Sequence, residues 1–204
     1  AIMAYNVCDI SEEKTLIKKI ILLCAAFMMI TVNSAAAADD GEDSGNMGLG
    51  ISVPVFIMHM KIAARKVKWG FSSSRIENEM IRTEDGNYVA EYNDAILLYL
   101  NTMPGTKMLR NIALSFTIAE GDTPMGFSRG GLPNGEDQYE SICQQVIMAF
   151  DPHISQKETR RMLGRLGLYG PVLDGRQRYD RRGGLAYIMK LQNNGTIVLV
   201  VSGI

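Results

Sequence analysis

The sequence predicts an α+β fold, an antiparallel sheet with amphipathic helices packed on one face. Two kinds of pattern support this prediction. Apolar residues recur at helical spacing in segments such as 56–71, whereas apolar and polar residues alternate strictly over 111–118. In addition, Asn194-Gly195 between the apolar runs 185–191 and 196–201 is a strong hairpin signal. Helices and hairpins that follow one another without βαβ spacing favour α+β over a doubly wound parallel sheet.

The first half of the domain is expected to contain two helices and two strands. A helix over 56–69 follows an extended entry at 53–55, and Gly70 with the following serines ends it. Residues 75–83 are a candidate strand. A second helix is expected over 88–101, because apolar residues recur there at helical spacing, and the alternation around 112–118 predicts a strand with one face on the core.

The second half is expected to contain an αα-hairpin followed by a C-terminal β-hairpin. Asn134 is a candidate cap for a third helix with the apolar stripe Tyr139, Ile142, Cys143, Val146, Ile147 and Phe150. Asp151-Pro152 ends this helix, and Ser155 with Glu158 forms a capping box that opens a fourth helix through Leu166. Strands are then expected over 175–181, 185–191 and 196–201.

Residues 16–38 have the three parts of a secretory signal peptide. Lys18 and Lys19 precede a short apolar run over 20–32, and the alanines up to Ala38 suit a signal peptidase. The run is shorter than the roughly 20 apolar residues that a membrane-spanning helix needs. We therefore expect cleavage after Ala36 or Ala38, export to the periplasm of a Gram-negative bacterium, and no membrane anchor after cleavage.

The remaining domain boundaries follow from the signal. Residues 1–15 are interpreted as an untranslated or non-native leader with the true start at Leu16 or Ile17; the alternative is a start at Met3 with a long acidic n-region. Residues 39–50 are acidic and Gly-rich, so a flexible linker is expected there. Residues 51–204 are expected to form a single globular domain.

Charge and cysteine content restrict the partners and the chemistry. The formal net charge of −1 gives no reason to expect nucleic acid as a partner. Cleavage would leave Cys143 as the only cysteine, and its place in an apolar stripe predicts a buried core thiol. Leu23 before Cys24 is unsuited to a lipoprotein site. His59 and His153 have no neighbours at metal-ligand spacing, so no metal or cofactor is expected.

One segment matches the nucleophile-elbow pattern of serine hydrolases. In Gly126-Phe-Ser-Arg-Gly130 the nucleophile would be Ser128, with His153 as the only downstream histidine. That motif requires a helix directly after the serine, but Pro133 and two glycines follow, and no parallel sheet is predicted. We therefore expect a glycine-rich loop here and no catalytic residues.

The best candidate binding site is a cluster of basic residues late in the chain. Arginine presents a planar fork that suits carboxylates and phosphates, so the cluster could bind an acidic protein or an anionic ligand. The alternative is a solvated helix face beside a basic hairpin edge that prevents aggregation. The site residues are Arg160, Arg161, Arg165, Arg176, Arg178, Arg181 and Arg182.

The chain also resembles the YiiQ-like family of uncharacterised, exported enterobacterial proteins. The resemblance rests on Pro54-Val55-Phe56, on the segment 93–120, and on 141–195 with its Met148-Ala-Phe-Asp-Pro152 link and Asn194-Gly195. Family members continue past the last strand, whereas this chain ends at Ile204. The resemblance implies a periplasmic protein of unknown function and supplies no catalytic residues.

These observations favour an exported, non-catalytic binding or interaction domain. The alternative is a periplasmic immunity or inhibitor protein that neutralises a toxin or hydrolase, and a serine hydrolase using Ser128 is the least favoured hypothesis. The oligomeric state is left open by the sequence.

Overall fold

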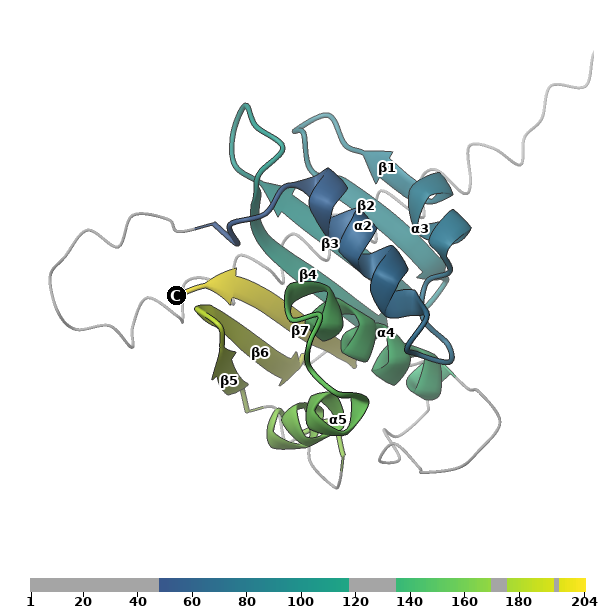
Figure 1. Ribbon diagram of the computed structural model, residues 1–204, viewed down its shortest axis with the longest axis vertical. Coiled ribbons are helices and arrows are strands. Elements are labelled where there is room, and N and C mark those ends of the chain that lie inside the picture. Colours follow the sequence, from purple (N-terminus) through teal and green to yellow (C-terminus); the bar gives the residue numbers. More distant parts are fainter. Residues whose placement is uncertain (1–47, 118–134, 170–175, 193–194) are drawn as a thin grey trace, which may run out of the picture. The chain divides into compact units, whose positions relative to one another are not determined.

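The computed structural model describes residues 48–117, 135–169, 176–192 and 195–204. Within these ranges an antiparallel sheet has helices packed against it, which confirms the predicted α+β class (Figure 1). The predicted leader, the signal peptide, most of the acidic segment and the Ser128 motif lie outside the described residues.

All seven strands belong to one sheet, and every neighbouring pair is antiparallel. The order is β1-β2-β3-β4-β7-β6-β5, so β4 lies in the centre with three strands on either side. The strand bounds are β1 Met80–Arg82, β2 Tyr88–Asn93, β3 Ile96–Thr102, β4 Leu109–Thr117, β5 Arg178–Arg182, β6 Leu185–Leu191 and β7 Thr196–Gly203.

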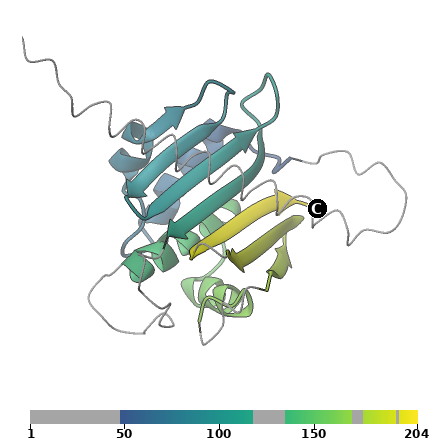
Figure 2. The ribbon, with the colours of Figure 1, turned by 180° about the vertical axis from the view of Figure 1, so that it is seen from behind.

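The described helices lie on one side of the sheet. They are α2 (Val53–Ala64), α3 (Ser73–Asn78), α4 (Gly135–Phe150) and α5 (Gln156–Arg165). Figure 1 shows α2 and α4 in front of the strands, and the opposite view in Figure 2 shows the strands nearest the viewer with these helices behind. The core forms between the two layers, with Phe56 and Met60 of α2 and Ile142 and Val146 of α4 packed against the sheet.

Several predicted elements are confirmed. Strand β4 contains the alternating segment, and α4 and α5 form the αα-hairpin. The capping box at α5 has both of its hydrogen bonds, between Ser155 and the backbone N–H of Glu158 and between the Glu158 carboxylate and the backbone N–H of Ser155. Strands β6 and β7 pair as the C-terminal hairpin, with Gly195 at a φ of 77° in the turn.

The predicted helix over 88–101 is wrong, because this segment forms the hairpin of β2 and β3. The Asn93 side chain makes the turn, accepting hydrogen bonds from the backbone N–H groups of Ala95 and Ile96. The run Ile96–Leu100 is buried throughout, as in a strand covered on both faces, and such a run has no period that separates it from a helix.

Two further boundaries differ from the prediction. Helix α2 begins at Val53, with Pro54 in its first turn where a missing N–H costs nothing, and it ends at Ala64. The first part of the predicted strand over 75–83 instead belongs to α3, because the Ser72 hydroxyl caps this helix by accepting a hydrogen bond from the backbone N–H of Arg75. Only the last part of that segment, β1, is a strand.

Candidate functional site

The basic cluster is carried by two elements that contact each other. Helix α5 carries Arg160, Arg161 and Arg165, and strand β5 carries Arg178, Arg181 and Arg182, with Arg176 just before it. Helix α5 packs beside β5 at the edge of the sheet. The fourth helix and the basic strand therefore lie side by side.

The three arginines of α5 point in different directions. Thr159, Met162 and Leu163 form the buried side of the helix. Arg160 lies on one flank, where its Nε is 3.3 Å from Glu140 Oε1 of α4. Arg165 lies on the other flank, where its guanidinium donates hydrogen bonds of 2.9 and 2.6 Å to Asp180 Oδ2 of β5. Arg161 projects from the side opposite the buried residues.

The arginines of β5 are divided between the two faces of the sheet. Arg178 is opposite Met189, a core residue, so Arg178 and Arg182 lie on the helix side. Arg181 lies on the other face, where its guanidinium is 5.8 Å from the centroid of the Tyr179 ring. Because successive residues of a strand alternate between faces, Arg181 is separated from Arg178 and Arg182.

Carboxylates balance part of the remaining charge. Arg182 Nε donates a 2.6 Å hydrogen bond to Asp151 Oδ2 in the link between α4 and α5. Partial burial raises the pKa of Asp151, but the hydrogen bonds from Arg182 and from the backbone N–H of His153 outweigh it and hold that pKa below its usual value. The same hydrogen bond raises the pKa of Arg182. Arg160, Arg165 and Arg182 thus each have a carboxylate partner.

Lys157 and Arg161 form an outward pair on α5. They are four residues apart, and such residues are neighbours on a helix surface. Both are exposed, and neither has a carboxylate partner among the described residues. We call Lys157 and Arg161 the outer basic pair. Arg161 belongs to the predicted cluster, whereas Lys157 was not among the predicted site residues.

A polar cluster that sequence reasoning missed lies beside this surface. The Tyr169 hydroxyl donates a 2.6 Å hydrogen bond to Glu140 Oε1, and Gln144 Nε2 donates one of 2.7 Å to the same oxygen. Burial, and then the bond to Glu140, raise the pKa of Tyr169. Together with Arg160 these residues join α4, α5 and the segment after α5. The spacing of Glu140 and Gln144 was a signal for a pair within one helix, but nothing in the sequence pointed to Tyr169.

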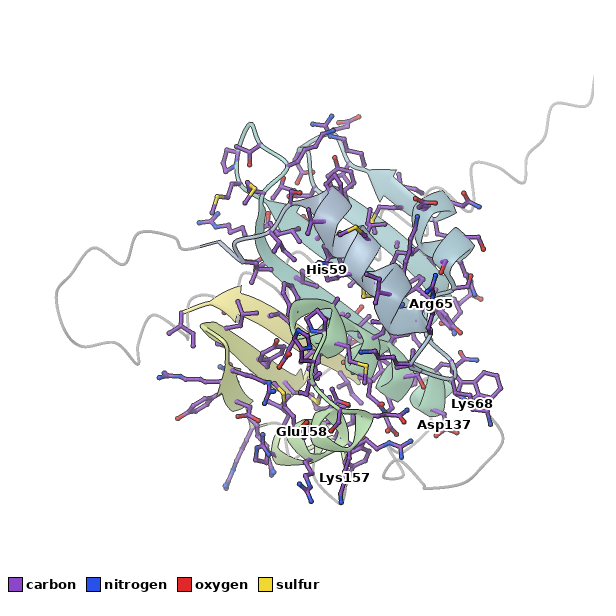
Figure 3. All side chains as sticks on the ribbon, in the orientation of Figure 1. His59, Arg65, Lys68, Asp137, Lys157 and Glu158 are labelled. Atoms are coloured by element: carbon purple, nitrogen blue, oxygen red, sulfur yellow. The ribbon has the colours of Figure 1, made fainter. Side chains whose placement is uncertain are left out.

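The candidate catalytic and metal-ligating residues that the structure describes lie on separate elements. Cys143 is a fully buried free thiol whose pKa is raised by that burial, which confirms its place in the core. Within α2, His59 (Figure 3) donates a hydrogen bond of 2.8 Å from Nδ1 to the carbonyl oxygen of Ala149. His153 lies in the link between α4 and α5. Ser128 is outside the described residues.

The described part of the chain contains no group of three or more His, Cys, Asp or Glu side chains placed to hold a metal ion. Among the same residues, no helix combines the length and the apolar character that crossing a bilayer requires.

Comparisons of the chain with protein-family models, with curated proteins and with solved structures find no match. Nothing in them links the chain to the YiiQ-like family, so that resemblance stays a prediction.

Proposed function

We propose that this protein is an exported, non-catalytic binding domain that engages an acidic protein or an anionic ligand in the bacterial periplasm. The observation that carries the proposal is the outer basic pair, Lys157 and Arg161, on the exposed side of α5. The cationic start, short apolar run and small residues of 16–38 support the location. An immunity or inhibitor protein is the particular case in which the acidic partner is a toxin or a hydrolase.

Binding an anion costs less free energy at the outer basic pair than at the arginines around it. Arg165 and Arg182 would have to give up hydrogen bonds to Asp180 and Asp151 before they could bind another anion. Lys157 and Arg161 would give up only water. Arg161 presents a fork that can take both oxygens of a carboxylate, and Lys157 adds a mobile point charge about 6 Å away.

Such a surface acts mainly on the rate of encounter. Exposed charges attract an oppositely charged partner over about a Debye length, which is about 10 Å at 0.1 M salt. The association rate should therefore fall as salt is added, and the dissociation rate should change less.

A pair of matched double variants tests the proposal. In one, Lys157→Ser and Arg161→Ser remove the outer basic pair. In the other, Arg65→Ser and Lys68→Ser remove the same charge from the segment that follows α2, away from Lys157 (Figure 3). Both are exported, purified from the periplasm, and assayed for binding to polyaspartate by fluorescence anisotropy and for capture of periplasmic proteins, at low and moderate salt.

We expect the α5 variant to lose polyaspartate binding and partner capture at low salt, whereas the α2 variant keeps both. Equal losses in the two variants would mean that only net charge matters. Unchanged binding in a folded α5 variant would contradict the proposal and leave the pair as a solubilising surface. The intact mass of the purified protein checks export, because we expect the processed chain to begin between Ala37 and Asp39.

A further inference from the structure

Helix α2 carries apolar side chains on the side that faces solvent as well as on the side that faces the sheet. The buried side consists of Val53, Phe56, Met60 and Ala63. On the opposite side, Met58 is 50% exposed, Ile62 is 46% exposed, and Pro54 is exposed one turn before Met58. Residues at this spacing are neighbours on a helix surface, so the three form one row. We call Pro54, Met58 and Ile62 the α2 ridge.

The α2 ridge is open to solvent because the flanks of the helix, and not the ridge, contact the neighbouring helices. On one flank His59 donates its hydrogen bond to a carbonyl oxygen of α4, and on the other Lys61 forms an ion pair with Glu77 of α3. The ridge lies between these flanks and is about 12 Å long, at about 1.5 Å per residue. A surface helix usually carries polar residues on this side, so an apolar row here calls for a function.

Cations gather where the α2 ridge ends. Arg65 directly follows the helix, and it is exposed with no carboxylate partner among the described residues. Lys68 is also exposed, and Figure 3 shows both cations beyond the end of α2. The dipole of a helix favours cations at its C-terminus, which explains their place but not the apolar row before them. An apolar row with a basic end is complementary to a surface that has an apolar interior and anionic headgroups.

The only tryptophan of the chain lies beside these cations. Trp69 is partly buried, and Lys68 Nζ lies 4.9 Å from the centroid of its ring. Tryptophan is enriched where a membrane meets water, because its ring is apolar and its N–H is polar. Lys68 and Trp69 therefore have the composition of an interfacial anchor.

A lipid surface fits the α2 ridge better than a protein partner does. Stable protein interfaces bury about 800 Å² on each partner, much more than three partly exposed side chains provide. A bilayer needs no matching shape, and its affinity for a helix grows with each apolar side chain inserted and each cation near the headgroups.

We propose that the α2 ridge, with Arg65 and Lys68 at its end, binds the protein peripherally to an anionic phospholipid surface. Met58 and Ile62 enter the boundary between headgroups and acyl chains, while the two cations meet lipid phosphates. Each cation close to an anionic leaflet contributes about fivefold to the partition constant. The side chains involved are already exposed, so docking requires no rearrangement of the core. The outer basic pair is on α5, so this proposal stands apart from the proposed function.

Trp69 provides a direct test, because emission from a single tryptophan reports on this part of the chain alone. The exported protein is purified and mixed with vesicles of phosphatidylcholine, with or without an equal part of phosphatidylglycerol. Co-sedimentation measures binding, and lipids brominated on their acyl chains measure insertion. We expect Trp69 emission to move to shorter wavelength and to be quenched by the brominated lipid. Binding to phosphatidylcholine alone should be at least about tenfold weaker.

Two matched double variants test the apolar part of the surface. Met58→Ser with Ile62→Ser removes the α2 ridge and should weaken vesicle binding at least about tenfold. Ile81→Ser with Ile204→Ser removes two similarly exposed apolar side chains from β1 and from the last residue, and binding should stay within about threefold of wild type. Circular dichroism checks that each variant is folded.

Two further double variants, already used above, test the charges. Arg65→Ser with Lys68→Ser should weaken binding to the phosphatidylglycerol vesicles about tenfold or more. Lys157→Ser with Arg161→Ser makes the same charge change on α5 and should alter it less than about threefold. Added salt should weaken binding of the wild type.

A folded wild type that does not bind phosphatidylglycerol vesicles would overturn the proposal, and so would binding that loss of Met58 and Ile62 leaves intact. A shift in Trp69 emission with protein concentration alone would assign the α2 ridge to a second copy of the chain. Capture of a periplasmic protein that depends on Met58 and Ile62, without vesicle binding, would assign it to a protein partner. Either of these results would also overturn the lipid proposal.

Discussion

The two faces of the sheet use neighbouring residues of the same strands for different purposes. On β7, Leu199 belongs to the core under the helices, while Val198 and Val200, on either side of it, point away from the helices. The helix side is lined by large side chains such as Leu98 and Leu114. This comparison shows that a strand with apolar residues at successive positions is buried on both faces of the sheet. Among the described residues, helices lie on only one of these faces.

The largest expected difference between the faces comes from truncating neighbours on β7. Leu199→Ala leaves a cavity in the core and should lower the free energy of unfolding by about 2–5 kcal/mol, independently of protein concentration. Val200→Ala removes fewer atoms, from a residue outside the core under the helices, so its effect should be smaller. Urea unfolding measures both effects. Losses of equal size would remove the distinction between the faces.

Replacing Cys143, which lies on the helix side of the sheet, is expected to have an intermediate effect on stability. Cys143→Ser places a hydroxyl in a fully buried site and should lower the free energy of unfolding by about 1–3 kcal/mol. Burial raises the pKa of the Cys143 thiol, so this thiol should react with alkylating agents only after the protein has unfolded. Cys143→Ala, which adds no polar atom, is the matched variant for stability. Rapid alkylation of the native protein would contradict the core assignment.

The smallest effect on stability is expected from breaking the ion pair between Asp151 and Arg182, at the edge of the sheet. Because the pKa of Asp151 is lowered in the folded state, its ionised form contributes stability that is present above the ordinary value of 3.8. This contribution is lost as the pH falls through the lowered pKa. Asp151→Asn should therefore cost about 0.5–1 kcal/mol at neutral pH, and the stabilities of wild type and variant should converge as the pH falls through the lowered pKa.

Thermal unfolding as a function of pH measures this difference. Asp94→Asn, in the exposed turn between β2 and β3, is the control and should change stability little at any pH. A wild-type advantage over Asp151→Asn that grows in acid would have the wrong sign for a lowered pKa.

The elements predicted correctly are those whose period and end signals agree. Strand β4 has strict alternation, and α5 has a capping box, so each has a single consistent interpretation. The hairpin of β2 and β3 was missed because Ile96–Leu100 is apolar at every position, and a strand covered on both faces loses its period. The capping role of Ser72 was missed because a serine after a helix also serves as its end.

The candidate site was predictable in composition but not in organisation. Seven arginines close in sequence predicted a basic surface, and the packing of α5 beside β5 brings most of them together. Their partners Glu140 and Asp151 lie on α4 and in the link after it, and only the tertiary fold brings them close.

Footprinting of single tyrosines tests the contrast between the faces most directly. Tyr179 of β5 is exposed on the face of the sheet away from the helices, and Tyr139 of α4 is fully buried in the core. The exported protein is exposed to a short pulse of hydroxyl radicals at several concentrations, and mass spectrometry measures oxidation of each tyrosine. We predict that Tyr179 is oxidised at every concentration, while Tyr139 stays protected throughout. Oxidation of Tyr139 in the folded protein, to the same extent as Tyr179, would contradict the placement of the core between the sheet and the helices.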